Sequence, residues 1–158
     1  MTPSSPLPSP LPSPLPSPLP THRRSRIDEE GIADLVVAFY ARARHDHVLG
    51  PVFLAALGPE GPEWIPHLER VAAFWSSVML ASGRYLGRPM QAHAALPGLS
   101  PDHFDRWLTL FEATAADLFQ EREATAFALR ARRMAAALEQ GIGLSRDGDP
   151  GSGAAQTS

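Results

Sequence analysis

The sequence predicts an all-α fold, and three observations support this prediction. Four segments repeat apolar residues at the i, i+3, i+4, i+7 spacing of a helix with one buried face. No segment alternates apolar and polar residues over the length of a strand. Glycine and proline residues separate most of the helical segments, where they end one helix or begin the next. We therefore expect one helical domain over residues 28–144.

The two ends of the chain have the composition of disordered segments. Residues 1–20 repeat Leu-Pro-Ser-Pro, which removes backbone donors and predicts an extended or disordered tail. A short basic run follows at residues 22–26, so the tail and its linker span residues 1–27. Residues 145–158 are rich in Gly and Ser and are predicted to be a second disordered tail. The proline repeat could bind an aromatic-lined groove of a partner, but a solvated tail is the simpler interpretation.

Composition excludes several classes of function. The net charge of -3 gives no basic field that would recruit nucleic acid. Because the chain has no cysteine, it can form neither disulfides, nor thiolate metal sites, nor a covalent haem attachment. The longest uncharged apolar stretch, residues 71–83, is shorter than a membrane span. We expect a cytoplasmic protein that binds neither membrane nor nucleic acid.

The first helix is expected to begin after Asp28, which can cap it. Its apolar stripe consists of Ile32, Leu35, Val36, Phe39, Tyr40 and Ala43. Residues 52–57 are interpreted as a short apolar turn, with Gly50 and Pro51 beyond the end of the first helix, and residues 58–62 as a loop rich in glycine and proline.

A second long helix is predicted over residues 63–82, provided that Pro66 lies in its first turn. Its inward stripe consists of His67, Val71, Phe74, Trp75 and Val78. The next segment, residues 83–97, combines glycines and prolines with a single imidazole, His93. Gly83 and Gly87 are expected to break the helix there, so that His93 lies on a turn.

Two more helices complete the domain. The first starts with Ser100 as its cap and Pro101 at its first position, and it continues with an apolar stripe through Phe104, Trp107 and Phe111. The last is predicted from about Glu123 to Leu138, after a break near Gln120.

The predicted helices bring two histidines and several aromatic side chains to one place. A flat apolar ligand could lie between His67 and His93, lined by Phe53, Phe74, Phe104, Trp107 and Phe111. Haem iron needs a neutral imidazole on one face and, to bind a gas, an open position on the other. His93 is the candidate iron ligand. The candidate donors to the gas are Tyr40, His67 and Trp107, and Arg70 could pair with a haem propionate.

These residues together resemble a known family, the group III truncated haemoglobins. The resemblance covers about residues 28–140, and it rests on Phe39-Tyr40, Gly50-Pro51-Val52-Phe53, Trp64 with His67, Phe74-Trp75, the run from Tyr85 through Gly87 and Pro89 to His93, and Phe104 with Trp107. The family implies a two-on-two helical globin fold around haem b, with a loop in place of a full proximal helix.

Carried over by position, the resemblance makes His93 the proximal ligand, Tyr40 and Trp107 the distal donors, His67 the distal gate and Phe53 a ring packed on the haem. Phe74, Tyr85 and Phe104 join the haem-binding set. Pro66 departs from the family directly before His67, and it bears on whether His67 faces the pocket. The N-terminal proline repeat is a second departure, outside the family's core.

Three functions remain open on the sequence alone. The first is a haem b protein that binds dioxygen or another diatomic gas at five-coordinate iron. The second uses the same haem for nitric oxide dioxygenation or peroxidase-like chemistry; because the chain has no flavin or nicotinamide motif, turnover would then need a separate reductase. The third is a haem-free helical interaction module.

Two other histidine positions are weaker candidates. The run His45-Asp46-His47 has the residue types of a metal site, but a polar turn explains it better. His103 falls in the first turn of a helix and is treated as a surface residue.

Overall fold

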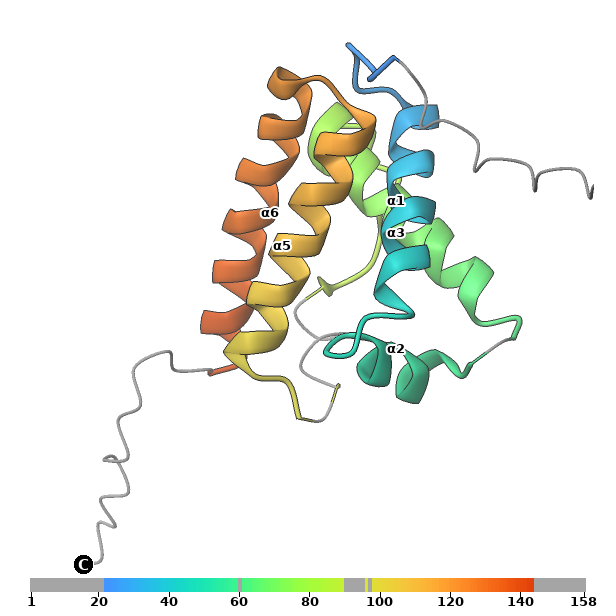
Figure 1. The fold of residues 1–158 in the computed structure, drawn as a ribbon, viewed down its shortest axis with the longest axis vertical. Coiled ribbons are helices and arrows are strands. Elements are labelled where there is room, and N and C mark those ends of the chain that lie inside the picture. The colour runs from blue at the N-terminus through green and yellow to red at the C-terminus, as the bar shows by residue number, and fades with distance from the viewer. Residues whose placement is uncertain (1–21, 60, 90–95, 97, 144–158) are drawn as a thin grey trace, which may run out of the picture.

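The computed structural model describes residues 22–59, 61–89, 96 and 98–143. In this part of the chain the regular structure is helical, which confirms the predicted all-α fold. The helices are α1 (Glu29–Ala43), α2 (Gly50–Leu57), α3 (Trp64–Leu80), α5 (Pro101–Leu118) and α6 (Glu121–Gly141). Helix α1 packs against both α3 and α5, and α5 packs against α6 (Figure 1).

Helix α1 follows the sequence prediction closely. The Asp28 side chain accepts a hydrogen bond of 2.8 Å from the backbone N–H of Gly31, and so caps the helix. The predicted apolar stripe is buried along its whole length. This stripe faces both α3 and α5, so α1 links α3 to the α5–α6 pair.

Helix α2 corrects the sequence interpretation of residues 52–57 as a turn. Gly50 and Pro51 open the helix instead of lying in a connection. The Asp46 carboxylate, which precedes the helix, accepts hydrogen bonds from the backbone N–H groups of Val48 (2.9 Å) and Leu49 (3.0 Å). These bonds satisfy donors next to the helix start, and Pro51 has a backbone angle suited to a first turn.

Helix α3 tolerates Pro66 because this proline is its third residue, where its missing N–H is not needed. The helix ends at Leu80, two residues earlier than expected, and Ala81 adopts a left-handed conformation with φ 52°. Residues 81–88 have no regular structure, in agreement with the predicted break around Gly83 and Gly87.

Helices α5 and α6 form an antiparallel hairpin (Figure 1). Ser100 and Pro101 begin α5 as predicted, and the break near Gln120 is confirmed. Arg24 joins the N-terminal segment to the turn of this hairpin: its N–H donates to the Leu118 carbonyl (2.8 Å), and its carbonyl accepts from the Gln120 N–H (2.9 Å).

The core between the helices is aromatic. Phe111 of α5 is 1% exposed and stacks on Trp75 of α3, with ring centroids 4.7 Å apart, and on Trp107 of its own helix, 5.0 Å apart. This stack separates the turn of the α5–α6 hairpin from the end where α5 begins, and a cavity lies at the latter end. No helix among the described residues combines the length and the apolar character that crossing a bilayer requires.

Candidate functional site

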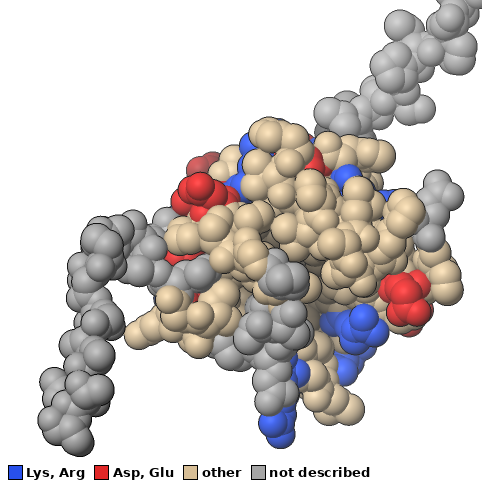
Figure 2. All heavy atoms as spheres, turned by 90° about the horizontal axis from the view of Figure 1, so that it is seen from below, with Lys and Arg blue, Asp and Glu red and all other residues tan. Residues whose placement is uncertain are grey.

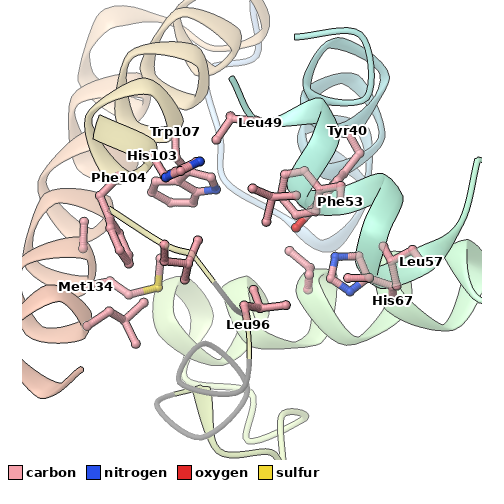
Figure 3. Close-up of a pocket in the computed structure, with 16 residues that line it drawn as sticks. Tyr40, Leu49, Phe53, Leu57, His67, Leu96, His103, Phe104, Trp107 and Met134 are labelled. Carbon is pink, nitrogen blue, oxygen red and sulfur yellow. The ribbon is translucent and has the colours of Figure 1, made fainter. Parts of the chain in front are cut away.

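A cavity of about 270 Å³ lies between the start of α5, the end of α6 and the short helix α2 (Figure 3). Its volume is close to the lower end of the range for small-molecule sites. The residues that line it are Tyr40, Leu49, Val52, Phe53, Ala56, Leu57, His67, Val71, Leu96, Leu99, His103, Phe104, Trp107, Met134, Ala135 and Leu138. Twelve of these sixteen are apolar and none carries a formal charge, so the cavity suits a largely apolar ligand.

Tyr40 and His67 lie together at one end of the cavity, beside Phe53 (Figure 3). The Tyr40 ring meets the His67 ring edge to face, with centroids 5.0 Å apart, and the Phe53 ring at 5.2 Å. Tyr40 is only 6% exposed, and this burial raises the pKa of its phenol far above the ordinary value. The hydroxyl therefore stays protonated and can donate a hydrogen bond at any physiological pH.

His67 faces the cavity even though a proline precedes it. It is the fourth residue of α3, and its backbone N–H donates to the Glu63 carbonyl (3.2 Å). Its Nε2 atom is buried. Pro66 therefore does not turn His67 away from the pocket.

Trp107 and Phe104 form the α5 wall of the cavity. The Trp107 indole is held in place by its nearly parallel stacking on Phe111, at an interplanar angle of 7°. Phe104 is 6% exposed and packs with Ala135 and Leu138 of α6. Two turns of α5 thus present flat aromatic surfaces to the cavity.

His103 lines the cavity and is half-buried, which corrects its treatment as a surface residue. Its Nδ1 atom accepts a hydrogen bond of 3.1 Å from the backbone N–H of Ser100, and the Ser100 side chain accepts from the backbone N–H of His103. This reciprocal pair is a capping box, and it folds the ring back over the start of α5. The spacing Ser-x-x-His was the sequence signal that could have identified it.

Three residues of the predicted haem-binding set are not among those that line the cavity. Arg70 is exposed on α3. Phe74 and Tyr85 contact each other, with ring centroids 5.3 Å apart, beyond the lining residues of α3. Phe111, predicted to face the same space, is a core residue behind Trp107. His93 lies outside the described residues.

Several lining residues were missed by sequence reasoning. Leu49 and Val52 precede or begin a helix that was interpreted as a turn. Met134 and Leu138 lie on the predicted apolar stripe of the last helix, and this position alone indicates only that they face inward. Periodicity identifies such residues as inward-facing, but it does not distinguish packing from the lining of a cavity.

Asp46 explains the polar run at residues 45–47. Its carboxylate accepts from Arg106 Nε at 2.7 Å and forms an ion pair with the same guanidinium, so it ties the start of α2 to α5. The hydrogen bond from Arg106 lowers the pKa of Asp46, and those from the N–H groups of Leu49 and Val48 add to this effect. They outweigh the burial of the carboxylate, which acts in the opposite direction, and the pKa is about 2. Among the described residues, no group of three or more His, Cys, Asp or Glu side chains could hold a metal ion.

Comparison with known proteins places this arrangement among the globins. The chain is 35% identical over 109 residues to the Group 3 truncated hemoglobin ctb of Campylobacter jejuni subsp. jejuni serotype O:2, an alignment that covers 69% of this chain and 86% of that protein. The crystal structure of the group III truncated hemoglobin from Campylobacter jejuni superposes with a TM-score of 0.75 at 31% identity, covering 81% of this chain and 99% of that one. No family model matches the chain.

Proposed function

The chain belongs to the group III truncated haemoglobins, and on this premise we propose that it holds haem b in the cavity and binds dioxygen or another diatomic gas there. The observation that carries this proposal is the convergence of Tyr40, His67 and Trp107, from three different helices, on a cavity that is otherwise mainly apolar. A site for an apolar metabolite would not need three hydrogen-bond donors of this kind in its wall.

The residues present fit haem by their chemistry. A porphyrin is a large flat apolar ring, and the lining offers the faces and edges of Phe53, Phe104 and Trp107 together with aliphatic side chains. When bound, haem would supply an iron that takes a small gas molecule at its open position. The imidazole proposed to hold that iron is His93, by the family resemblance of its segment. Leu96, three residues later in the chain, lines the cavity.

The polar groups of Tyr40, His67 and Trp107 would then act on the bound gas. A gas ligand that gains partial negative charge is stabilised by a nearby hydrogen-bond donor, for which the Tyr40 hydroxyl is available because it stays protonated. The indole N–H of Trp107 is a second donor of fixed orientation, since stacking on Phe111 holds the ring. His67 stands beside Tyr40 and would limit the space at that end.

Reconstitution of the full-length chain with hemin tests the proposal. The expected result is an intense Soret band at one hemin per chain, which shifts or weakens in His93→Ala. His47→Ala is the matched control, because His47 is exposed and does not line the cavity. A Soret band that is identical in wild type and His93→Ala would remove His93 as the iron ligand, and failure of the wild type to bind hemin would favour the haem-free interaction module.

A further inference from the structure

His103 is the polar residue of the cavity that the proposed gas site does not use. His103 lies beside Trp107 at the start of α5, across the cavity from Tyr40 and His67 (Figure 3). Because its half-buried ring also lines the cavity, it stands between the cavity and solvent.

The capping box fixes the tautomer of His103. The Nδ1 atom faces the Ser100 hydroxyl at 2.9 Å and the Ser100 backbone N–H at 3.1 Å. The backbone N–H can only donate, so this bond assigns a lone pair to Nδ1, to which the hydroxyl can also donate. In the neutral ring the proton is then on Nε2. With the Nδ1 edge turned towards Ser100, the Nε2–H lies on the far side of the ring, and His103 offers a donor of fixed orientation beside the cavity.

The surroundings of His103 favour an anionic acceptor for this donor. The N-terminus of α5 carries a partial positive charge, which extends over its first turn. None of the lining residues has a negative charge that would oppose an anion. Seen from the end where α5 begins, most of the described surface is neither acidic nor basic, and basic side chains are present on this face (Figure 2).

Neither Arg106 nor Arg70 supplies an alternative partner. Arg106, one turn after His103, is engaged with the buried carboxylate of Asp46. Arg70, the residue that the sequence suggested for a propionate, is exposed and does not line the cavity. A carboxylate at the rim of the cavity would lose water and would need a donor in exchange.

We infer that His103 holds a carboxylate of the ligand in this cavity through its Nε2–H, while its Nδ1 caps α5. The inference rests on the proposed function, in which the ligand is haem b and the carboxylate is one of its two propionates. His103 is then a residue that positions the cofactor and takes no part in binding the gas.

Comparison of hemin with hemin dimethyl ester tests the inference, because the ester lacks both carboxylates but keeps the ring and the iron. The rate at which each cofactor leaves the full-length protein is measured by transfer to an excess of a haem-scavenging apoprotein. The quantity of interest is the ratio of the ester rate to the hemin rate. A change that only destabilises the fold raises both rates, so it cancels in this ratio.

Two substitutions separate the two roles of the ring. In His103→Asn the Oδ1 atom can replace Nδ1 in the cap, but the donor at the Nε2 position is lost. In His103→Gln the side-chain oxygen can still accept from the Ser100 N–H, as Gln does in a capping box, and the side-chain N–H can take the place of the Nε2–H. We expect His103→Asn to lose hemin about fivefold faster than wild type with little change for the ester, and His103→Gln to keep most of the wild-type ratio.

Each outcome decides between the alternatives. A ratio that is the same in wild type and His103→Asn would overturn the inference, whether the two rates stay constant or rise together. If His103→Asn does not fold, as judged by circular dichroism, His103→Phe provides the same comparison. If wild type binds neither hemin nor its ester, the proposed function fails and the inference with it; binding of both with equal loss rates refutes the carboxylate contact alone.

Discussion

Asp46→Asn is the substitution whose effect on stability can be worked out most directly. The Asp46 side chain is 4% exposed and keeps a pKa of about 2 against an ordinary value of 3.8. A depression of this size corresponds to about 2.5 kcal/mol of stability at neutral pH. Because the Arg106 side chain is 38% exposed and partly screened by water, we expect about 2 kcal/mol. Asn keeps a side-chain oxygen that can accept from the N–H groups of Val48 and Leu49. The decrease in the free energy of unfolding therefore reflects mainly the loss of the negative charge.

The sign of the pH dependence follows from the lowered pKa. A carboxylate whose folded pKa lies below its unfolded value stabilises the protein above the unfolded value, and this contribution disappears as the pH falls through the folded one. The difference in the free energy of unfolding between wild type and Asp46→Asn should therefore be largest near pH 7. It should begin to decrease at about pH 4 and be nearly zero at about pH 2.

Urea unfolding followed by circular dichroism, repeated over this pH range, measures the difference. Asp117→Asn is the control, because Asp117 also pairs with an arginine, Arg42, but is 42% exposed. The free energy of unfolding of Asp117→Asn should differ from that of wild type by no more than about 0.5 kcal/mol. A loss for Asp46→Asn that is equally small, or one that stays constant from about pH 7 to pH 3, would refute the assignment of the stabilisation to the buried charge.

Three further substitutions test the core, the site and the start of α2. Phe111→Ala should lower the free energy of unfolding by about 3 to 5 kcal/mol, since its ring is stacked on Trp75 in the centre of the core; a loss under about 1 kcal/mol in urea unfolding would contradict this. Tyr40→Phe should speed dissociation of dioxygen from the hemin-reconstituted, reduced protein about fivefold, with hemin retention unchanged; an unchanged rate in a flash or stopped-flow experiment would remove Tyr40 from the gas site. Gly50→Ala should cost about 1 to 3 kcal/mol, because its Cβ would lie 2.8 Å from the Arg44 carbonyl oxygen; an unchanged melting temperature would mean that the backbone there can move.

The helices with a regular apolar stripe and a polar cap could be predicted from the sequence. Asp28 and Ser100 mark the starts of α1 and α5 because they are the residue types that satisfy free N–H groups at a helix start. The inward direction of Tyr40, His67 and Trp107 followed from the same periodicity, since residues three or four positions apart share a face.

Features that depend on contacts between distant parts of the chain could not be predicted from periodicity and capping residues. Helix α2 is too short to show a clear period, and it begins beside a carboxylate that is itself held by Arg106 of α5. The role of His103 depends on a side chain folding back onto its own cap. Phe74 shares a helix face with His67, but it lies about 10 Å further along the axis, where it meets Tyr85 and not the cavity.

The two backbone hydrogen bonds between Arg24 and the turn of the α5–α6 hairpin bear on where a label or a linker can be attached to this protein. These bonds hold the N-terminal segment at the end of the hairpin opposite the cavity, which is lined by the start of α5 and the end of α6 (Figure 1). A fluorescent reporter or a linker attached at residue 22 would thus begin at the end of the bundle where α5 turns into α6. An attachment made directly at residue 22 would therefore leave the cavity on the far side of the bundle.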